Sequence, residues 1–246
     1  MRLAELNVVL VPGLLCDKAV WKPQLAALKD VARMQVADHG ELDSLVAMAD
    51  AILAQAPPKF AVVGHSMGGR VALEVVRRAA SRVTGLALLD TGYAPRPAGE
   101  AGTKEAAARH ALLDLARSAG MRAVGERWLS IPMIHEARLK ERKLVESILG
   151  MIERRTPEQF AAQIRALLAR PDATALLPMI SCPTLVLCGH DDAWAPLSTH
   201  RVMAQLIPHS TLVTVPECGH MCTMERPEPV STALRTWLAR VAKMSS

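Results

Sequence analysis

Apolar residues gather in short runs that are separated by longer stretches with helical spacing. Six runs are short and aliphatic enough to be typical of buried strands: 6–11, 34–37, 60–63, 83–89, 184–188 and 210–215. Helical stretches lie near 21–28, at 44–55 and from residue 70 onward. Strands that alternate with helices in this way predict an α/β fold, a mainly parallel sheet flanked by helices on both faces.

The alternation stops after Thr91. From there to about residue 175 the sequence favours helices throughout, most clearly at 105–119, 137–152 and 157–169. Pro171 and Pro178 then mark the return to the alternating pattern. We therefore expect residues 1–91 and 176–246 to form one core, with residues 92–175 as a helical insertion.

A glycine-rich hexapeptide, Gly64-His65-Ser66-Met67-Gly68-Gly69, joins the predicted strand at 60–63 to a helical stretch. Ser66 lies at the apex of this sharp turn, where a hydroxyl can be exposed to a base and to a carbonyl group at once. The helix that begins there directs its first N–H groups toward the same place. The Met67 N–H is therefore a candidate donor to an oxyanion.

Two later segments supply acids and a histidine, in that order. The predicted strand at 184–188 is followed by Asp191 and Asp192, and the strand at 210–215 runs into a loop that ends at His220. Asp90 ends the strand at 83–89 and is a further candidate acid. Because the carboxyl ends of parallel strands meet at one edge of a sheet, we expect these side chains to gather near Ser66.

With the motifs G-H-S-M-G-G, G-x-x-D-x-x-x-P and G-H in this order, the chain resembles the α/β-hydrolase superfamily over almost its whole length. The resemblance implies a catalytic triad in which Ser66 is the nucleophile, Asp192 the orienting acid and His220 the general base. Some members place the acid at the position of Asp90, and a shift of one residue would select Asp191, so these alternatives stay open. The resemblance also implies that residues 92–175 form a cap over the active site.

A second oxyanion donor is expected on the loop after the first strand, at 6–11. By position the Leu14 N–H is the candidate, and Gly13 lets the backbone approach the substrate. The common family pattern has a histidine before this glycine, where the chain has Pro12. Because the donor is a backbone group, we expect the oxyanion hole to survive this difference.

We expect the cap to select the substrate, because it closes over the nucleophile. Its most apolar cluster either seals the cap onto the sheet or faces the substrate, and consists of Trp128, Leu129, Ile131, Met133 and Ile134. Four residues are candidates for substrate binding by their place in the cap or beside the triad: Tyr93, Trp128, Trp194 and Met221.

The charge balance is mildly basic. The net charge is +5, and residues 92–175 hold 14 Lys or Arg against 10 Asp or Glu, an excess of four. This excess reflects either solvated helix faces with ion pairs, such as Glu136 with Lys140, or an attraction for an anionic substrate or an acidic carrier protein. Aromatic residues make up 3% of the chain, which supplies no stacking platform, so we expect no nucleic-acid partner.

The five cysteines are an odd number in a mid-sized chain that shows no secretory leader, which favours reduced thiols and a cytoplasmic location. No apolar run approaches the roughly 18 residues of a membrane span. A metal site near Cys218, His220 and Cys222 would usually need a second ligand cluster, and none is apparent. We therefore expect no membrane association, no metal and no cofactor.

The nucleophile narrows the reaction. Members of the superfamily that open epoxides or displace halides carry aspartate at the elbow, so a serine there favours acyl transfer. We expect a serine hydrolase that cleaves a carboxylic ester of a small substrate through an acyl-Ser66 intermediate. A lactone or enol-lactone hydrolase of aromatic-compound breakdown is the nearest alternative, and a mainly ligand-binding protein or a carbon–carbon lyase is the alternative from another class.

Overall fold

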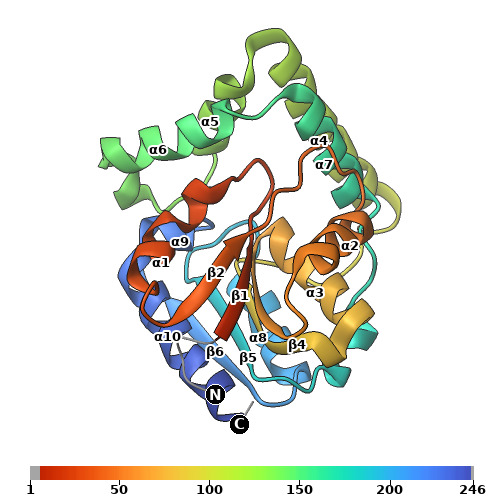
Figure 1. Cartoon of the computed structure of the whole chain (residues 1–246). Helices are drawn as coiled ribbons and strands as arrows, with labels where there is room; N and C mark the ends of the chain where they lie inside the picture. The colour runs from red at the N-terminus through yellow and green to blue at the C-terminus, as the bar shows by residue number, and fades with distance from the viewer. Residues whose placement is uncertain (1–5, 245–246) are drawn as a thin grey trace.

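The computed structural model describes residues 6–244, which fold around one six-stranded parallel sheet (Figure 1). The strands are ordered β2-β1-β3-β4-β5-β6 across the sheet. Their bounds are β1 Leu6–Val11, β2 Ala32–Val36, β3 Phe60–His65, β4 Val83–Leu89, β5 Thr184–Gly189 and β6 Ser210–Val215. This architecture confirms the α/β fold that the alternating pattern predicts.

Both faces of the sheet are covered, which explains why most of its strands are apolar along their whole length. In β1, Leu6, Val8 and Leu10 enter the core on one face, whereas Val9 and Val11 enter the core on the other. The first face carries α1 (Lys22–Ala27), α9 (Cys222–Glu225) and α10 (Pro227–Met244). The second carries α2 (Leu45–Gln55), α3 (Met67–Ala79) and α8 (Leu197–Leu206) (Figure 1).

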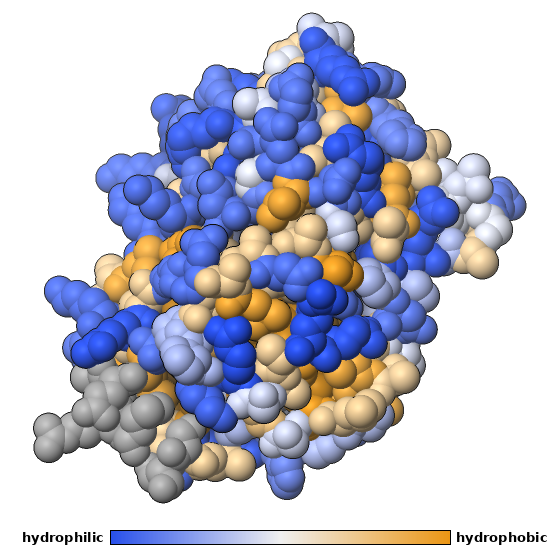
Figure 2. Space-filling model, turned by 45° about the vertical axis from the view of Figure 1, so that its right-hand side comes forward, coloured by the Kyte–Doolittle hydropathy of each residue, from blue (hydrophilic) through white to orange (hydrophobic). Residues whose placement is uncertain are grey.

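Between β4 and β5 the chain leaves the sheet and forms the group of helices at the top of Figure 1. We call this segment the cap, and its helices are α4 Gly99–Ala119, α5 Met121–Leu129, α6 Arg142–Glu153 and α7 Pro157–Leu168. On the face in Figure 2 hydrophilic colours dominate the upper part, where the cap lies, and the larger hydrophobic areas appear at mid-height and below. No helix within residues 6–244 is both long and apolar enough to cross a bilayer.

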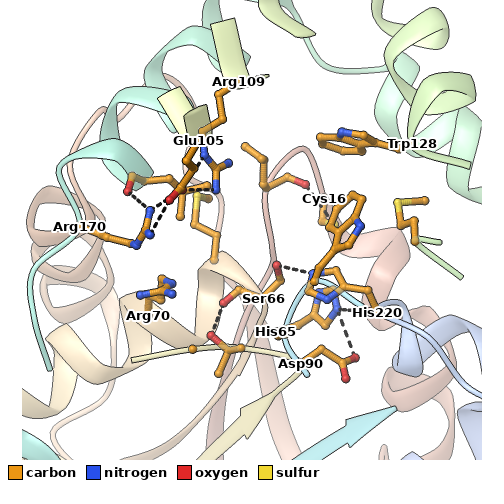
Figure 3. A pocket seen from close by; sticks show the side chains of 18 of the residues that line it. Cys16, His65, Ser66, Arg70, Asp90, Glu105, Arg109, Trp128, Arg170 and His220 are labelled. Carbon is orange, nitrogen blue, oxygen red and sulfur yellow. Dashed lines mark hydrogen bonds and ion pairs between the residues drawn. The ribbon is translucent and has the colours of Figure 1, made fainter. Parts of the chain in front are cut away.

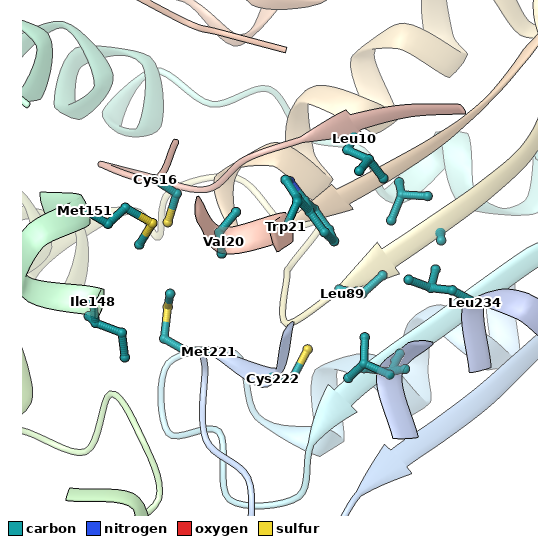
Figure 4. Close-up of a cluster of buried hydrophobic side chains, with 14 of the residues drawn as sticks. Leu10, Cys16, Val20, Trp21, Leu89, Ile148, Met151, Met221, Cys222 and Leu234 are labelled. Carbon is teal, nitrogen blue, oxygen red and sulfur yellow. The ribbon is translucent and has the colours of Figure 1, made fainter. Parts of the chain in front are cut away.

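The cap is joined to the core by apolar contacts. Ile148 and Met151 of α6 lie beside Cys16 of the loop after β1 and beside Met221 near α9 (Figure 4). These side chains belong to the same buried cluster as Leu10 and its neighbours on the first face of the sheet. The cap and the sheet therefore share one hydrophobic core.

Two features of the cap differ from the sequence-based expectation. The stretch 137–152 is not one helix, because a 3-10 helix, η4 (Glu136–Lys140), precedes α6. A 3-10 helix has three residues per turn, so side chains four apart do not face each other. Among the described residues Glu136 and Lys140 form no ion pair, so the expected pair is wrong. The helix α5 is also a difference, because the sequence pattern predicts no separate helix over Met121–Leu129.

The turn from β3 to α3 is pressed against the backbone of β1. A Cβ atom on Gly68 would lie 2.1 Å from the Val11 carbonyl oxygen and 2.6 Å from the Pro12 carbonyl oxygen. One atom belongs to β1, an interior strand of the sheet, and the other to the loop that leaves β1, so neither can give way without moving the sheet. The helix can begin at this point only because residue 68 has no side chain.

We expect Gly68→Ala to lower the free energy of unfolding by about 2 kcal/mol or more, since overpacking typically costs about 1–3 kcal/mol and here it displaces backbone. Gly150→Ala is the matched control, because a Cβ there would meet only Arg154 Nη1, at 3.7 Å. In a helix that change should stabilise the protein by about 0.5–1 kcal/mol. Urea denaturation followed by circular dichroism measures both, and equal stabilities would contradict the packing described.

Candidate active site

Ser66 lies at the carboxyl end of β3 in a backbone conformation that non-glycine residues rarely adopt. Its φ is 54° and its ψ is −120°. Such a conformation costs on the order of 1–3 kcal/mol and persists only where neighbouring contacts enforce it. Here the Ser66 N–H donates to the Leu89 carbonyl at 2.9 Å, and the Thr91 hydroxyl donates to the Ser66 carbonyl at 2.6 Å. The hydroxyl of Ser66 is thereby presented above the sheet edge.

The structure brings Ser66, His220 and Asp192 into one hydrogen-bonded row (Figure 3 shows Ser66 and His220). His220 Nε2 lies 2.8 Å from Ser66 Oγ, and His220 Nδ1 lies 2.8 Å from Asp192 Oδ2. Because an ionised carboxylate can only accept, Nδ1 carries the proton and Nε2 is left to accept from the Ser66 hydroxyl. The three side chains follow three different strands, β3, β5 and β6, at the same edge of the sheet.

Electrostatics in this row favour a basic imidazole. Burial by itself lowers the pKa of His220, but the charge and the hydrogen bond of Asp192 outweigh it and leave the pKa raised. Burial likewise raises the pKa of Asp192, yet the His220 charge and hydrogen bond, with the N–H groups of Ala195 and Trp194, leave that pKa lowered. The pair is therefore set up for a proton to be held on the histidine rather than on the acid.

The two other candidate acids lie apart from the His220 ring. Asp191 is exposed, and its Oδ1 lies 3.1 Å from Nδ1 of His190. Asp90 is fully buried and accepts hydrogen bonds from the backbone N–H groups of Gly189 and Cys222. Burial and repulsion from Asp192 raise the pKa of Asp90 to about 8. The structure thus places Asp192, and neither alternative, against the imidazole.

The two backbone groups expected to bind an oxyanion flank Ser66. Met67 is the first residue of α3, so its N–H has no acceptor within the helix. A Cβ on Gly13 would lie 3.0 Å from the Ser66 Cβ, which shows how closely the loop containing Leu14 approaches the serine. A residue that sequence reasoning missed supports this loop: the Gln163 side chain of α7 accepts the Leu15 N–H at 2.9 Å.

A cavity of about 580 Å³ opens above Ser66, between the cap and the sheet edge. Its size suits a small organic ligand. All four side chains expected to bind substrate line it, together with both expected oxyanion residues: Tyr93, Trp128, Trp194, Met221, Leu14 and Met67. In the apolar cluster of the cap, Ile131 and Met133 also line the cavity, whereas Ile134 is buried in the shared core and Leu129 packs against that core.

Charged residues in the cavity are the main feature that the sequence did not reveal. Arg70, Glu105, Arg109 and Arg170 all line its wall, from α3, α4 and the segment after α7 (Figure 3). The only signal in the sequence was the place of Arg70, four residues after Ser66 on the helix that follows the elbow. Glu105 and Arg109 are four residues apart on α4, so helical periodicity pairs them, but Arg170 is brought to Glu105 only by tertiary packing of the cap.

The cysteines near the site are not part of the hydrogen-bonded row of Ser66, His220 and Asp192. Cys218 and Cys222 are fully buried, and burial raises the pKa of both thiols well above the ordinary value. Cys16 lines the cavity, but burial raises the pKa of its thiol to about 12, so it is protonated. Within residues 6–244 no group of three or more His, Cys, Asp or Glu side chains is placed to hold a metal ion.

Comparison with known proteins places this geometry in a family. The model of the alpha/beta hydrolase family matches residues 8–233. A relative from Klebsiella pneumoniae that carries the name carbamate hydrolase RutD is 28% identical over 246 residues, with 94% of this chain and 91% of the relative covered. A pimeloyl-acyl-carrier-protein methyl ester esterase from Aromatoleum aromaticum is 27% identical over 237 residues, with 90% and 94% covered.

Among solved structures, a thermophilic esterase from Thermogutta terrifontis, studied with malate bound, superposes with a TM-score of 0.85. It is 33% identical, and the alignment covers 98% of this chain and 92% of that one. The family match extends over most of the chain and agrees with the fold and with this solved structure. The protein described here is a member of the alpha/beta hydrolase family.

Proposed function

We propose that this protein is a serine hydrolase that cleaves a carboxylic ester of a small substrate through an acyl-Ser66 intermediate. The observation that carries the proposal is the row of hydrogen bonds from Ser66 Oγ through His220 to Asp192, at the floor of a cavity. A hydroxyl is a weak nucleophile unless a base removes its proton, and this row supplies that base.

In the proposed reaction Ser66 Oγ attacks the ester carbonyl as His220 Nε2 takes its proton. The Leu14 and Met67 N–H groups stabilise the oxyanion of the tetrahedral intermediate, and His220 then gives the proton to the leaving alcohol. Water attacks the acyl-serine by the same route and releases the acid. Asp192 holds the imidazole in the required tautomer and stabilises its positive charge.

The comparisons support hydrolysis as the reaction class. One relative and one solved structure described above carry esterase names, and this chain shares their family. A lactone is a cyclic ester and would pass through the same tetrahedral intermediate, so the same groups would also open a lactone. A mainly ligand-binding or lyase role makes a different prediction, because p-nitrophenyl esters of short acids would then not turn over through Ser66.

We expect Ser66→Ala to reduce kcat for such esters by on the order of 10⁴-fold or more, since it removes the nucleophile. Asp192→Asn should reduce kcat by about 10⁴-fold, because an amide at this position stabilises the wrong tautomer of His220. Both are measured from p-nitrophenolate release, with circular dichroism to establish folding. Persistent turnover in Ser66→Ala would rule out the covalent mechanism.

Asp90→Asn is the matched control for the choice of acid. It leaves one of the two N–H donors to Asp90 without an acceptor, so it should cost about 1–3 kcal/mol of stability. Its kcat should nevertheless remain at least about 100 times that of Asp192→Asn, because the partner of the imidazole is kept. A larger kcat loss in Asp90→Asn than in Asp192→Asn would reverse the assignment of the acid.

The pH dependence of kcat/KM should report the raised pKa of His220. Only the neutral imidazole can accept the serine proton, so activity should rise with pH and reach half its plateau above the ordinary histidine value of 6.5. In Asp192→Asn the charge that raises this pKa is gone, so the residual activity should reach half-plateau at lower pH than in the wild type. A midpoint that does not move would show that Asp192 does not set the pKa of the base.

A further inference from the structure

The cavity above Ser66 has two unlike sides (Figure 3). On one side aromatic rings of Trp128, Trp194 and His220 follow one another, with ring centroids 5.4 Å and 5.0 Å apart. On the other side lie Arg70, Glu105, Arg109 and Arg170, which we call the arginine corner. A ligand that reaches Ser66 therefore meets aromatic rings in one direction and guanidinium groups in the other.

The arginine corner carries more positive than negative charge. Arg109 Nη2 lies 3.0 Å from Glu105 Oε1, and Arg170 Nη2 donates to Glu105 Oε2 at 2.8 Å. The Arg170 side chain is only 7% exposed, so its charge is well removed from water. One carboxylate thus serves two of three guanidinium groups, and the corner keeps an excess of two positive charges.

Arg70 is the member of the corner that has no carboxylate partner among the described residues. Its Nη1 donates to the Ala94 carbonyl at 2.8 Å, which is a neutral acceptor. Its Nη2 lies against Gly92, where a Cβ would come within 2.7 Å of that nitrogen. Burial and the charges of Arg170 and Arg109, opposed by the charge of Glu105, together lower the pKa of Arg70 to about 10. An anion beside this guanidinium would offset both its burial and its repulsion from Arg170 and Arg109.

Arg70 and the reacting Ser66 are close in sequence and line the same cavity. It is the fourth residue after Ser66, one turn along α3, which corresponds to about 6 Å of rise along the helix axis. Side chains of a helix lean toward its N-terminus, so the long arginine side chain is directed back toward the level of Ser66. A group a few bonds from an ester carbonyl at Ser66 can therefore reach it.

We propose that the substrate carries a carboxylate near its ester group, and that Arg70 binds this carboxylate at the arginine corner. The inference rests on the proposed function, since it places the carboxylate relative to an ester carbonyl bound at Ser66. A planar guanidinium matches a carboxylate with two parallel hydrogen bonds. Arg109 and Arg170, held by Glu105, add positive potential without being the direct partners.

A purely structural role accounts for only part of the corner. The Arg109–Glu105–Arg170 group links α4 to the segment after α7 and so holds the cap helices together. Arg70 is outside this group, because its hydrogen bond goes to Ala94, in the loop between β4 and α4. The two roles separate in experiment: a structural arginine affects all substrates alike, whereas a binding arginine affects the anionic ones.

Two matched substrate pairs test the proposal. In the first, monomethyl adipate is compared with methyl 6-methylheptanoate, in which an isopropyl group replaces the carboxylate. In the second, 4-acetoxybutanoate is compared with 4-methylpentyl acetate, which moves the charge to the alcohol side. The selectivity is the ratio of kcat/KM for the anionic ester to that for its neutral isostere, measured for each variant by acid release.

We expect wild-type protein to prefer the anionic ester of at least one pair, and Arg70→Met to lower that selectivity about 10- to 100-fold, as for loss of a hydrogen bond to a charged group. Arg70→Lys should lose less, because the charge is kept but the fork of donors is not. Arg78→Met, on the same helix and paired with Asp50 on the surface, should leave selectivity as in the wild type.

Esters that turn over through Ser66 with a selectivity unchanged by Arg70→Met would overturn this inference alone. So would a wild-type preference for the neutral isostere in both pairs. Failure of every ester, or full turnover by Ser66→Ala, would instead overturn the proposed function, and this inference with it. Because the neutral esters also report correct folding, a misfolded Arg70→Met protein cannot imitate the expected result.

Discussion

The placement of the His220 ring is the constraint on which the site depends. Its Nδ1 is fixed by Asp192, its backbone N–H donates to the Met133 carbonyl at 2.8 Å, and its carbonyl lies 2.8 Å from Nε2 of His65. Burial lowers the pKa of His65 to about 4, so this ring is neutral and donates its Nε2 proton to that carbonyl. Glu225 accepts the neighbouring N–H groups on either side of the histidine, at residues 219 and 221. Few of these contacts are local in sequence, so the ring can occupy its position only when the whole core has formed.

The cap is part of this support as well as a cover. Met133 holds the backbone of His220, and Gln163 holds the Leu15 N–H of the loop expected to bind the oxyanion. Arg155 donates to the Cys16 carbonyl in the same loop. Both the histidine loop and the oxyanion loop are thus bonded to the cap, which means that a movement of the cap would also move the groups around Ser66.

The strands of the sheet could be predicted from the sequence because short apolar runs bounded by turn residues are typical of buried strands. The strands at 6–11, 83–89 and 210–215 have the predicted limits, and the helix predicted at 44–55 is α2, whose N-cap Ser44 accepts the Val46 N–H. The motifs likewise predicted the three side chains that form the hydrogen-bonded row, Ser66, His220 and Asp192. The arginine corner could not be found in this way, because Arg170, in the segment after α7, meets Glu105 of α4 only through tertiary packing. The basic excess of residues 92–175 was compatible with solvated helix faces as well as with an anionic substrate, and Arg70 lies outside that segment.

The central claim is that Ser66 becomes covalently acylated with the help of His220. A p-nitrophenyl alkylphosphonate mimics the tetrahedral intermediate and bonds to an activated serine, so mass spectrometry of the digested protein tests the claim directly. We predict one adduct per chain, on the peptide that contains Ser66, formed much more slowly in His220→Gln. An adduct on another residue, or equal rates in the two proteins, would contradict the account.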